Sequence, residues 1–215
     1  MSDSPIRLVC FDLGGVLIRI CRSWEEGCRA AGLDVRYGAN GSGATGGAGW
    51  YASPDVTNLY QAGQISCDEF ARRCSAATGN AYTPEEIMAV HDAWLLEEYP
   101  GVGDVVDRIH ARGLETAALS NTNHAHWIRM PEFPAVMRLN SRFASHELGM
   151  FKPDPSIFRE FEKRVNRRGD DILFFDDLPD NIQAARAIGW LAELIDPHGR
   201  TDLQIESALR RHGML

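Results

Sequence analysis

Short apolar runs alternate with amphipathic stretches along much of this 215-residue chain. Apolar runs bounded by glycine, proline or polar residues predict buried strands, because strands covered on both faces of a parallel sheet read as nearly continuous apolar sequence. The predicted strands are Ile6 to Phe11, Glu115 to Leu119, Leu139 to Ala144, Ile172 to Phe175 and Leu191 to Ile195.

Three helices are predicted between these strands. They are Val102 to Arg112, a helix that begins at Asp154-Pro155, and a helix from about Pro179 to Ile188. Glycine follows the first and third of them, as is common where helices end, and an acidic N-cap before proline is a typical helix start. Strands that alternate with helices in this way predict an α/β fold with a doubly wound parallel sheet.

Residues 19–100 interrupt the alternation. They contain three helix-start signals of the Ser/Thr-x-x-Glu type: Ser23 with Glu26, Ser66 with Glu69, and Thr83 with Glu86. We therefore expect two domains, a core of residues 1–18 and 101–215 and a small helical cap of residues 19–100. Such a cap would lie over the strand ends and could act as a lid, with plain packing helices as the alternative.

A glycine-rich segment, Gly38 to Gly49, lies inside the expected cap. It matches the Gly-x-Gly-x-x-Gly dinucleotide fingerprint by letter only, because the following Trp50 to Pro54 is not a helix start and so offers no helix amino terminus to a pyrophosphate. We expect a flexible loop here that could overhang the active site.

Composition narrows the class of protein. The formal net charge of -8 argues against a nucleic-acid-binding surface, and no apolar run approaches the length of a membrane span. No signal peptide is expected, because the residues from Met1 to Pro5 lack a basic region followed by an apolar stretch. The five cysteines have no CxxC spacing, which favours reduced thiols in a cytoplasmic protein over disulfides or a zinc site. The acidity does not exclude a small phosphorylated molecule, the expected partner, because a local lysine and a metal can offset it; the oligomeric state stays open.

Candidate chemistry gathers at the carboxyl ends of the predicted strands, where open α/β sheets bind their ligands. Asp12 follows the first predicted strand, Ser120 the second, Lys152 the third, and Asp176-Asp177 the fourth. With the first strand central, these side chains can converge on one crevice.

The set suits phosphoryl transfer. Asp12 can attack phosphorus and form an aspartyl phosphate, and Asp12 with one member of the acidic pair can hold Mg²⁺, which prefers oxygen ligands. Ser120 and the amides after it can donate to phosphate oxygens, and Lys152 supplies a fixed positive charge.

Four motifs in this order resemble those of the haloacid dehalogenase superfamily. They are Phe11-Asp12-Leu13-Gly14-Gly15-Val16, Leu119-Ser120-Asn121, Lys152-Pro153 and Phe174-Phe175-Asp176-Asp177. The closer likeness is to bacterial sugar phosphatases that act on glucose 1-phosphate and to the amino-terminal phosphatase domain of soluble epoxide hydrolase.

The resemblance implies a Rossmann-like core, a cap and a role for each motif residue. Asp12 would be the nucleophile, Asp176 would orient Lys152, and Ser120, Asn121 and Lys152 would contact phosphate. Asp12, Asp177 and the backbone carbonyl of Gly14 would hold Mg²⁺. The implied activity is a Mg²⁺-dependent phosphatase for a small phosphorylated metabolite, with a sugar phosphate preferred.

Gly14 departs from the pattern, because most phosphatases of the superfamily have an aspartate there that protonates the leaving oxygen. General acid-base help of this kind is worth about 10²–10⁴-fold. An anomeric oxygen leaves more readily, so a sugar 1-phosphate would need that acid less. A histidine could also replace it (His124, His126 or His146), although packing or surface roles are the simpler reading of all three.

Three alternatives stay open at this point. The chain could bind a phosphorylated ligand without turnover, or it could be a metal-independent dehalogenase with the same nucleophile. A phosphotransferase such as a mutase is disfavoured without the usual second aspartate.

Among the tryptophans, Trp24, Trp50, Trp94 and Trp127 are expected in core or lid packing, not as a sugar platform.

Overall fold

A computed structural model describes residues 6–36 and 54–215 of the chain, so the predicted Gly38 to Gly49 loop lies outside the described residues. A five-stranded parallel sheet has the order β5-β4-β1-β6-β7, with β1 in the centre. The strands are β1 (Leu8–Phe11), β4 (Glu115–Ser120), β5 (Ser141–Ala144), β6 (Ile172–Asp176) and β7 (Leu191–Leu194). The predicted α/β fold with a parallel sheet is confirmed.

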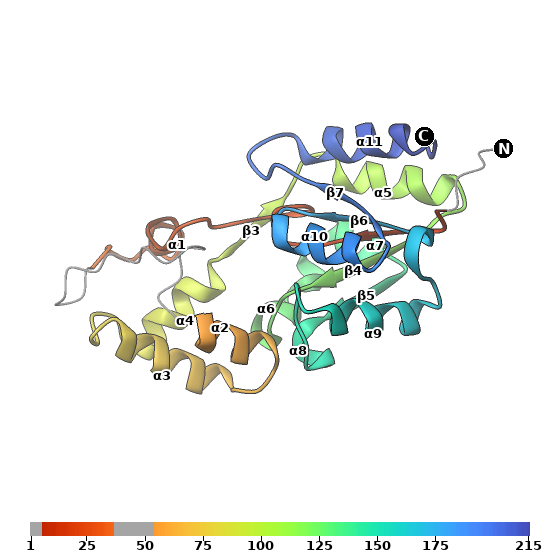
Figure 1. The fold of residues 1–215 in the computed structure, drawn as a ribbon. Coiled ribbons are helices and arrows are strands. Elements are labelled where there is room, and N and C mark those ends of the chain that lie inside the picture. The colour runs from red at the N-terminus through yellow and green to blue at the C-terminus, as the bar shows by residue number, and fades with distance from the viewer. Residues whose placement is uncertain (1–5, 37–53) are drawn as a thin grey trace.

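Helices cover both faces of this sheet (Figure 1). Alternate residues of β1 face opposite layers, because successive side chains of a strand point to opposite sides. Val9 and Phe11 pack in one layer, while Leu8 and Cys10 pack in the other. The first layer is formed by α5 (Val102–Ala111), α7 (Pro134–Arg138) and α11 (Thr201–Arg211), and the second by α9 (Pro155–Val165) and α10 (Pro179–Ala187).

The helix-end signals in the core act as the sequence predicts. The side chain of Asp154 accepts from the backbone N–H of Ser156 at 2.8 Å and so caps α9. Gly113 and Gly189, which follow α5 and α10, have φ angles of 75° and 98°. Glycine suits these positions because it adopts the left-handed region without steric cost.

A helical insertion lies beside the sheet at the left of Figure 1. It comprises α1 (Trp24–Ala30), α2 (Pro54–Gln61), α3 (Cys67–Ala77) and α4 (Pro84–Asp92). The expectation that no helix starts at Trp50 to Pro54 is wrong, because α2 begins at Pro54. All three predicted start signals are used: Ser23, Ser66 and Thr83 each accept from the backbone N–H of the glutamate three residues on.

The insertion has its own apolar cluster, which includes Trp24, Phe70, Tyr82 and Ile87. Trp24 and Trp94 are buried and Trp127 is half-buried against the core, while Trp50 lies outside the described residues. The exact limits of the cap, residues 19–100, stay a prediction. None of the described helices has the length and apolar character that crossing a membrane would require.

Two short strands differ from the predicted pattern. β2 (Ile18–Ile20) and β3 (Leu95–Glu98) pair antiparallel where the chain enters and leaves the insertion. Strands this short show too few alternations to be read from sequence. Four further helices and two 3-10 turns were also not predicted: α6 (His124–Trp127), α7, α8 (Ser145–Leu148), α11, η1 (Met130–Glu132) and η2 (Gly169–Asp171).

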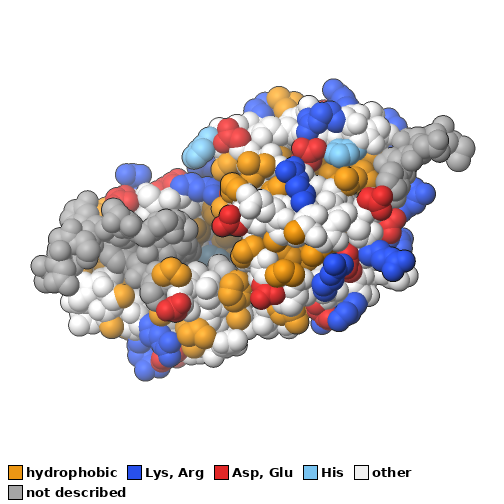
Figure 2. All heavy atoms as spheres, in the orientation of Figure 1, with side chains coloured by type: hydrophobic (Ala, Val, Ile, Leu, Met, Phe, Trp, Pro, Cys, Tyr) orange, Lys and Arg blue, Asp and Glu red, His pale blue; other side chains and the backbone are white. Residues whose placement is uncertain are grey.

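The visible surface mixes charges of both signs. On the face in Figure 2, Lys and Arg side chains lie among Asp and Glu side chains and do not form a continuous basic strip.

Candidate active site

The predicted residues Asp12, Ser120 and Asp176 lie at the carboxyl ends of three adjacent strands, β1, β4 and β6. The backbone N–H of Asp12 donates to the carbonyl of Phe175 at 2.8 Å, which continues the parallel pairing one residue past β1. All three residues are buried. The central position of β1 is what brings residues far apart in sequence to this edge.

Lys152 joins two of the acids. Its Nζ lies 2.6 Å from Oδ2 of Asp176 and 3.1 Å from Oδ1 of Asp12, and its side chain is 0% exposed. The contact with Asp12 is an ion pair without hydrogen-bond geometry, so Oδ1 of Asp12 has no hydrogen-bond donor among the described residues. Burial alone would lower the pKa of Lys152, but the charges of Asp12 and Asp176 outweigh it and raise that pKa.

The two adjacent acids have different partners. Asp176 is held by the side chain of Asn181, whose Nδ2 lies 3.0 Å from each carboxylate oxygen, and by the backbone N–H of Leu178 at 2.8 Å. Asp177 instead pairs with Arg22, Nη1 to Oδ2 at 2.7 Å. Asp176 is thereby fixed against Lys152, and Asp177 is turned toward the insertion.

Asn121 has a structural task in this arrangement. Its Nδ2 donates to the carbonyl of Lys152 at 2.7 Å, and its Oδ1 accepts from the backbone N–H of Lys152 at 2.8 Å. The side-chain amide is therefore committed to the lysine-bearing loop. The predicted phosphate contact of Asn121 would have to come from its backbone N–H, one of the amides after Ser120 that are expected to donate.

The carboxylates of Asp12, Asp176 and Asp177 fit a divalent cation. One oxygen from each lies within 4.8 Å of the others, and such oxygens are the ligands that Mg²⁺ prefers. Burial raises the pKa of Asp12 to about 7; Lys152 opposes this rise, and the charges of Asp176 and Asp177 add to it. A cation between these groups would favour their ionised forms.

A cavity of about 120 Å³ opens beside Gly14 and Ser120. The insertion and its connections contribute Gln61, Trp94 and Ile20 to its lining. A Cβ at residue 14 would lie 3.2 Å from Cδ1 of Ile20, so an apolar side chain crowds the position where an acid is missing. Restoring an aspartate at residue 14 would require Ile20 to move.

Histidine and serine side chains join the insertion to the core next to this cavity. The rings of His91 in α4 and His126 in α6 stack with centroids 3.8 Å apart. The Nε2–H of His126 donates to the carbonyl of His91 at 2.7 Å. Oγ of Ser145 lies 2.6 Å from the carbonyl of Gln61 and accepts from the backbone N–H of Thr122 at 2.9 Å.

The stacked histidines predict that acid weakens the fold. Burial, and then the neighbouring His91, lower the pKa of His126 well below 6.5. In the unfolded chain His126 binds a proton near pH 6.5, whereas in the folded protein it stays neutral at that pH. The free energy of unfolding is therefore highest above pH 6.5 and decreases as the pH falls. The loss is at most about 1.4 kcal/mol per pH unit for each histidine.

Urea denaturation at pH 7.5 and 5.5 measures this effect. His126→Gln should lose less stability than the wild type between the two values, because glutamine keeps a donor and does not titrate. Asp92 and Arg129 also face His91, so the comparison is made with both residues in place. An equal loss in both proteins would contradict the assignment of the effect to His126.

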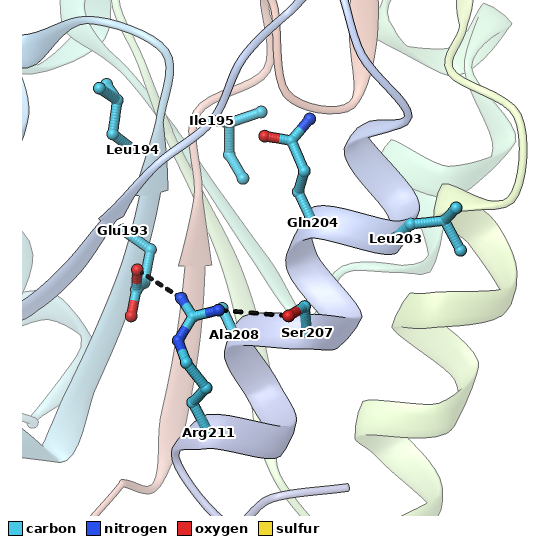
Figure 3. Close-up of a pocket in the computed structure, with 8 residues that line it drawn as sticks. All are labelled: Glu193, Leu194, Ile195, Leu203, Gln204, Ser207, Ala208 and Arg211. Atoms are coloured by element: carbon cyan, nitrogen blue, oxygen red, sulfur yellow. Dashed lines mark hydrogen bonds and ion pairs between the residues drawn. The ribbon is translucent and has the colours of Figure 1, made fainter.

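Another pocket, about 320 Å³ in volume, lies between β7 and α11 (Figure 3). Arg211 reaches across it from α11, with Nη2 2.8 Å from Oε2 of Glu193 and Nη1 3.2 Å from Oγ of Ser207. None of the predicted site residues lines this pocket. The carboxylate cluster with the adjoining 120 Å³ cavity is therefore the candidate site.

Three residues of the site were not predicted from the sequence. Arg22 pairs with Asp177, and Asn181 donates to Asp176. Ile20 fills the space beside Gly14. Asn181 gave a usable signal, because it lies in the first turn of the helix that follows the acidic pair. Arg22 and Ile20 gave none, since their contacts depend on where the insertion leaves the core.

Comparison with known proteins identifies relatives over nearly the whole chain. The family profile described as haloacid dehalogenase-like hydrolase matches residues 6–189. D-ribitol-5-phosphate phosphatase of Bacteroides thetaiotaomicron is 27% identical over 94% of this chain and 96% of its own length. A phosphatase of Mycobacterium tuberculosis is 23% identical over 91% and 90%.

Acyl-CoA dehydrogenase family member 10 of Mus musculus is 26% identical over 85% of this chain, but the chain spans only 17% of that protein. Among solved structures, a predicted haloacid dehalogenase-like hydrolase of Porphyromonas gingivalis has a TM-score of 0.74 at 24% identity, covering 95% of this chain and 98% of that one. An enzyme of Bacteroides thetaiotaomicron in complex with magnesium and inorganic phosphate has a TM-score of 0.71 at 21% identity, over 90% and 96%. These likenesses concern the fold.

Proposed function

Because the chain belongs to the haloacid dehalogenase-like hydrolases, we propose that it is a Mg²⁺-dependent phosphatase of a small phosphorylated metabolite. One observation carries the proposal: a buried lysine, three carboxylates and a serine-lined cavity lie together at one edge of the sheet. Two relatives that are named as phosphatases support it, and this chain matches each of them over at least 90% of its length.

In the proposed reaction a carboxylate oxygen of Asp12 attacks phosphorus, and the bond to the leaving alcohol breaks. Lys152, Ser120 and the backbone N–H of Asn121 would hold the phosphate oxygens, as preorganised donors do in such sites. Asp176 would keep Lys152 in place. Water then hydrolyses the aspartyl phosphate and restores Asp12.

The proposed metal ligands are Asp12, Asp177 and the backbone carbonyl of Gly14. When bound, Mg²⁺ would offset negative charge on the phosphate and on the carboxylates. The closeness of the carboxylates supports this assignment, because one oxygen of Asp12 and one of Asp177 lie within 4.8 Å of each other.

We propose that the leaving oxygen takes its proton from water, because glycine stands at residue 14 and Ile20 crowds the adjacent space. We therefore propose a sugar phosphate as the substrate, with the anomeric 1-phosphate first, since its leaving oxygen needs the least protonation. The named relative supports ribitol 5-phosphate, a primary alcohol phosphate, as the second candidate.

The proposed cap, residues 19–100, would cover the substrate. Gln61 and Trp94 from this segment line the cavity beside Ser120, which supports a part in substrate recognition. We include in the same proposal that the chain is most similar in its motifs to glucose 1-phosphate phosphatases and to the phosphatase domain of soluble epoxide hydrolase.

Phosphate release from glucose 1-phosphate, glucose 6-phosphate and ribitol 5-phosphate, with Mg²⁺ and with EDTA, tests the proposal. We expect steady release that EDTA abolishes, fastest with glucose 1-phosphate. A preference for either primary phosphate would contradict the argument from the leaving group, but the proposal of a phosphatase would still hold. Binding of these compounds without turnover would favour a non-catalytic binder, and metal-independent halide release from a 2-haloacid would favour a dehalogenase.

A further inference from the structure

Arg22 connects the insertion to the carboxylate cluster. It lies between β2 and α1, and its Nη1 is 2.7 Å from Oδ2 of Asp177, whose side chain is only 5% exposed. The backbone N–H of Arg22 donates to Oε2 of Glu26 in the first turn of α1 at 2.7 Å. The arginine therefore couples the first helix of the insertion to an acid of the core.

The contact between Arg22 and Asp177 is closely fitted. A Cβ at Gly15 would lie 2.3 Å from Nη2 of Arg22 and 2.4 Å from Oδ2 of Asp177, and Gly15 has a φ angle of 81°. A side chain at residue 15 would therefore exclude the ion pair. The guanidinium is packed directly against the loop that follows Asp12.

Charge in the cluster is divided between two cations. Lys152 lies between Asp12 and Asp176, which leaves Asp177 to Arg22. Burial by itself would lower the pKa of Arg22, but the hydrogen bond and charge of Asp177, with a smaller contribution from Tyr99, raise it above its usual value. The guanidinium thus remains a full positive charge against the acid proposed to hold the metal.

We propose that Arg22 is an internal counter-ion of the metal site and sets its affinity for Mg²⁺. This inference rests on the proposed function, which assigns Asp177 to the metal. An arriving cation must either displace the guanidinium, losing the ion pair, or bind beside it against like-charge repulsion. Both routes weaken Mg²⁺ binding, and by linkage bound Mg²⁺ weakens the hold of Arg22 on Asp177.

Calorimetric titration of the metal-free protein with MgCl₂ tests the inference. Arg22→Gln should bind Mg²⁺ about tenfold more tightly than the wild type, within the range typical of coupled sites. Arg22→Lys keeps the charge and should stay close to the wild type. The matched control is Arg19→Gln, three residues away, whose Nε pairs with Oε1 of the exposed Glu97 at 3.3 Å; its affinity should change by less than about twofold because solvent and salt screen it.

Equal or weaker Mg²⁺ binding by folded Arg22→Gln would overturn the inference alone. Absence of saturable Mg²⁺ binding by the wild type would overturn the proposed metal site and this inference with it. Circular dichroism establishes that each variant is folded. Should Arg22→Gln not fold, the Nε–H resonance of Arg22 in the wild type decides the question: a shift that saturates with Mg²⁺ supports the inference, and no change contradicts it.

Discussion

Asp12→Asn should abolish phosphate release while leaving the fold intact. Asparagine has nearly the same shape but lacks the carboxylate that forms the aspartyl phosphate. Loss of a covalent nucleophile removes most of an enzyme's rate enhancement, so we expect a fall on the order of 10⁴-fold or more in kcat. Phosphate release in excess Mg²⁺, with the best substrate of the proposed panel, measures it.

The same substitution should not destabilise the metal-free protein. Burial raises the pKa of Asp12 from 3.8 to about 7, so the folded state binds the proton more tightly than the unfolded state. Ionisation of Asp12 therefore costs stability as the pH rises through that interval, and an asparagine at this position has no such cost. Urea unfolding at pH 8 should show an Asp12→Asn protein at least as stable as the wild type, and retained turnover in this folded variant would refute Asp12 as the nucleophile.

Lys152→Met should lose both stability and activity. Methionine fills much of the same space, but Asp12 and Asp176 then lose the buried cation between them. Removing one partner of a buried ion pair typically costs about 3–5 kcal/mol, because an uncompensated charge remains. Loss of a donor to the transferred phosphoryl group should lower kcat by a further 10²–10³-fold, approximately, in whatever protein remains folded.

The other lysine of the chain provides a matched control. Lys163 is 76% exposed and lies 3.5 Å from Glu160, so Lys163→Met should change the unfolding free energy by less than about 0.5 kcal/mol. Adding Asp176→Asn to Lys152→Met removes one of the two buried carboxylates that have lost their counter-ion, and it should restore part of the stability. Unchanged urea midpoints in Lys152→Met would show that the buried pairs do not support the fold.

Sequence patterns predicted the core because local signals agreed with the tertiary fold there. The apolar runs ending at Phe11 and Phe175 became neighbouring central strands, and Asp154 capped its helix as expected. The carboxyl-end rule placed Asp12, Ser120 and Asp176 at one edge from the strand pattern alone. The strand Ile18–Ile20 was missed, because its three residues show too few alternations of apolar and polar positions to be recognised in the sequence.

The sequence by itself determined the α/β class, the helix starts in the insertion and the set of acids and lysine that meet at the sheet edge. These features depend on periodicity, capping and strand order, which act over short distances or through one general topological rule. Only the tertiary structure decided that Arg22 pairs with Asp177, that the Asn121 amide holds the Lys152 loop, and that Ile20 crowds the space beside Gly14. Such contacts arise where separately folded segments meet, and no local pattern records the direction from which a distant side chain arrives.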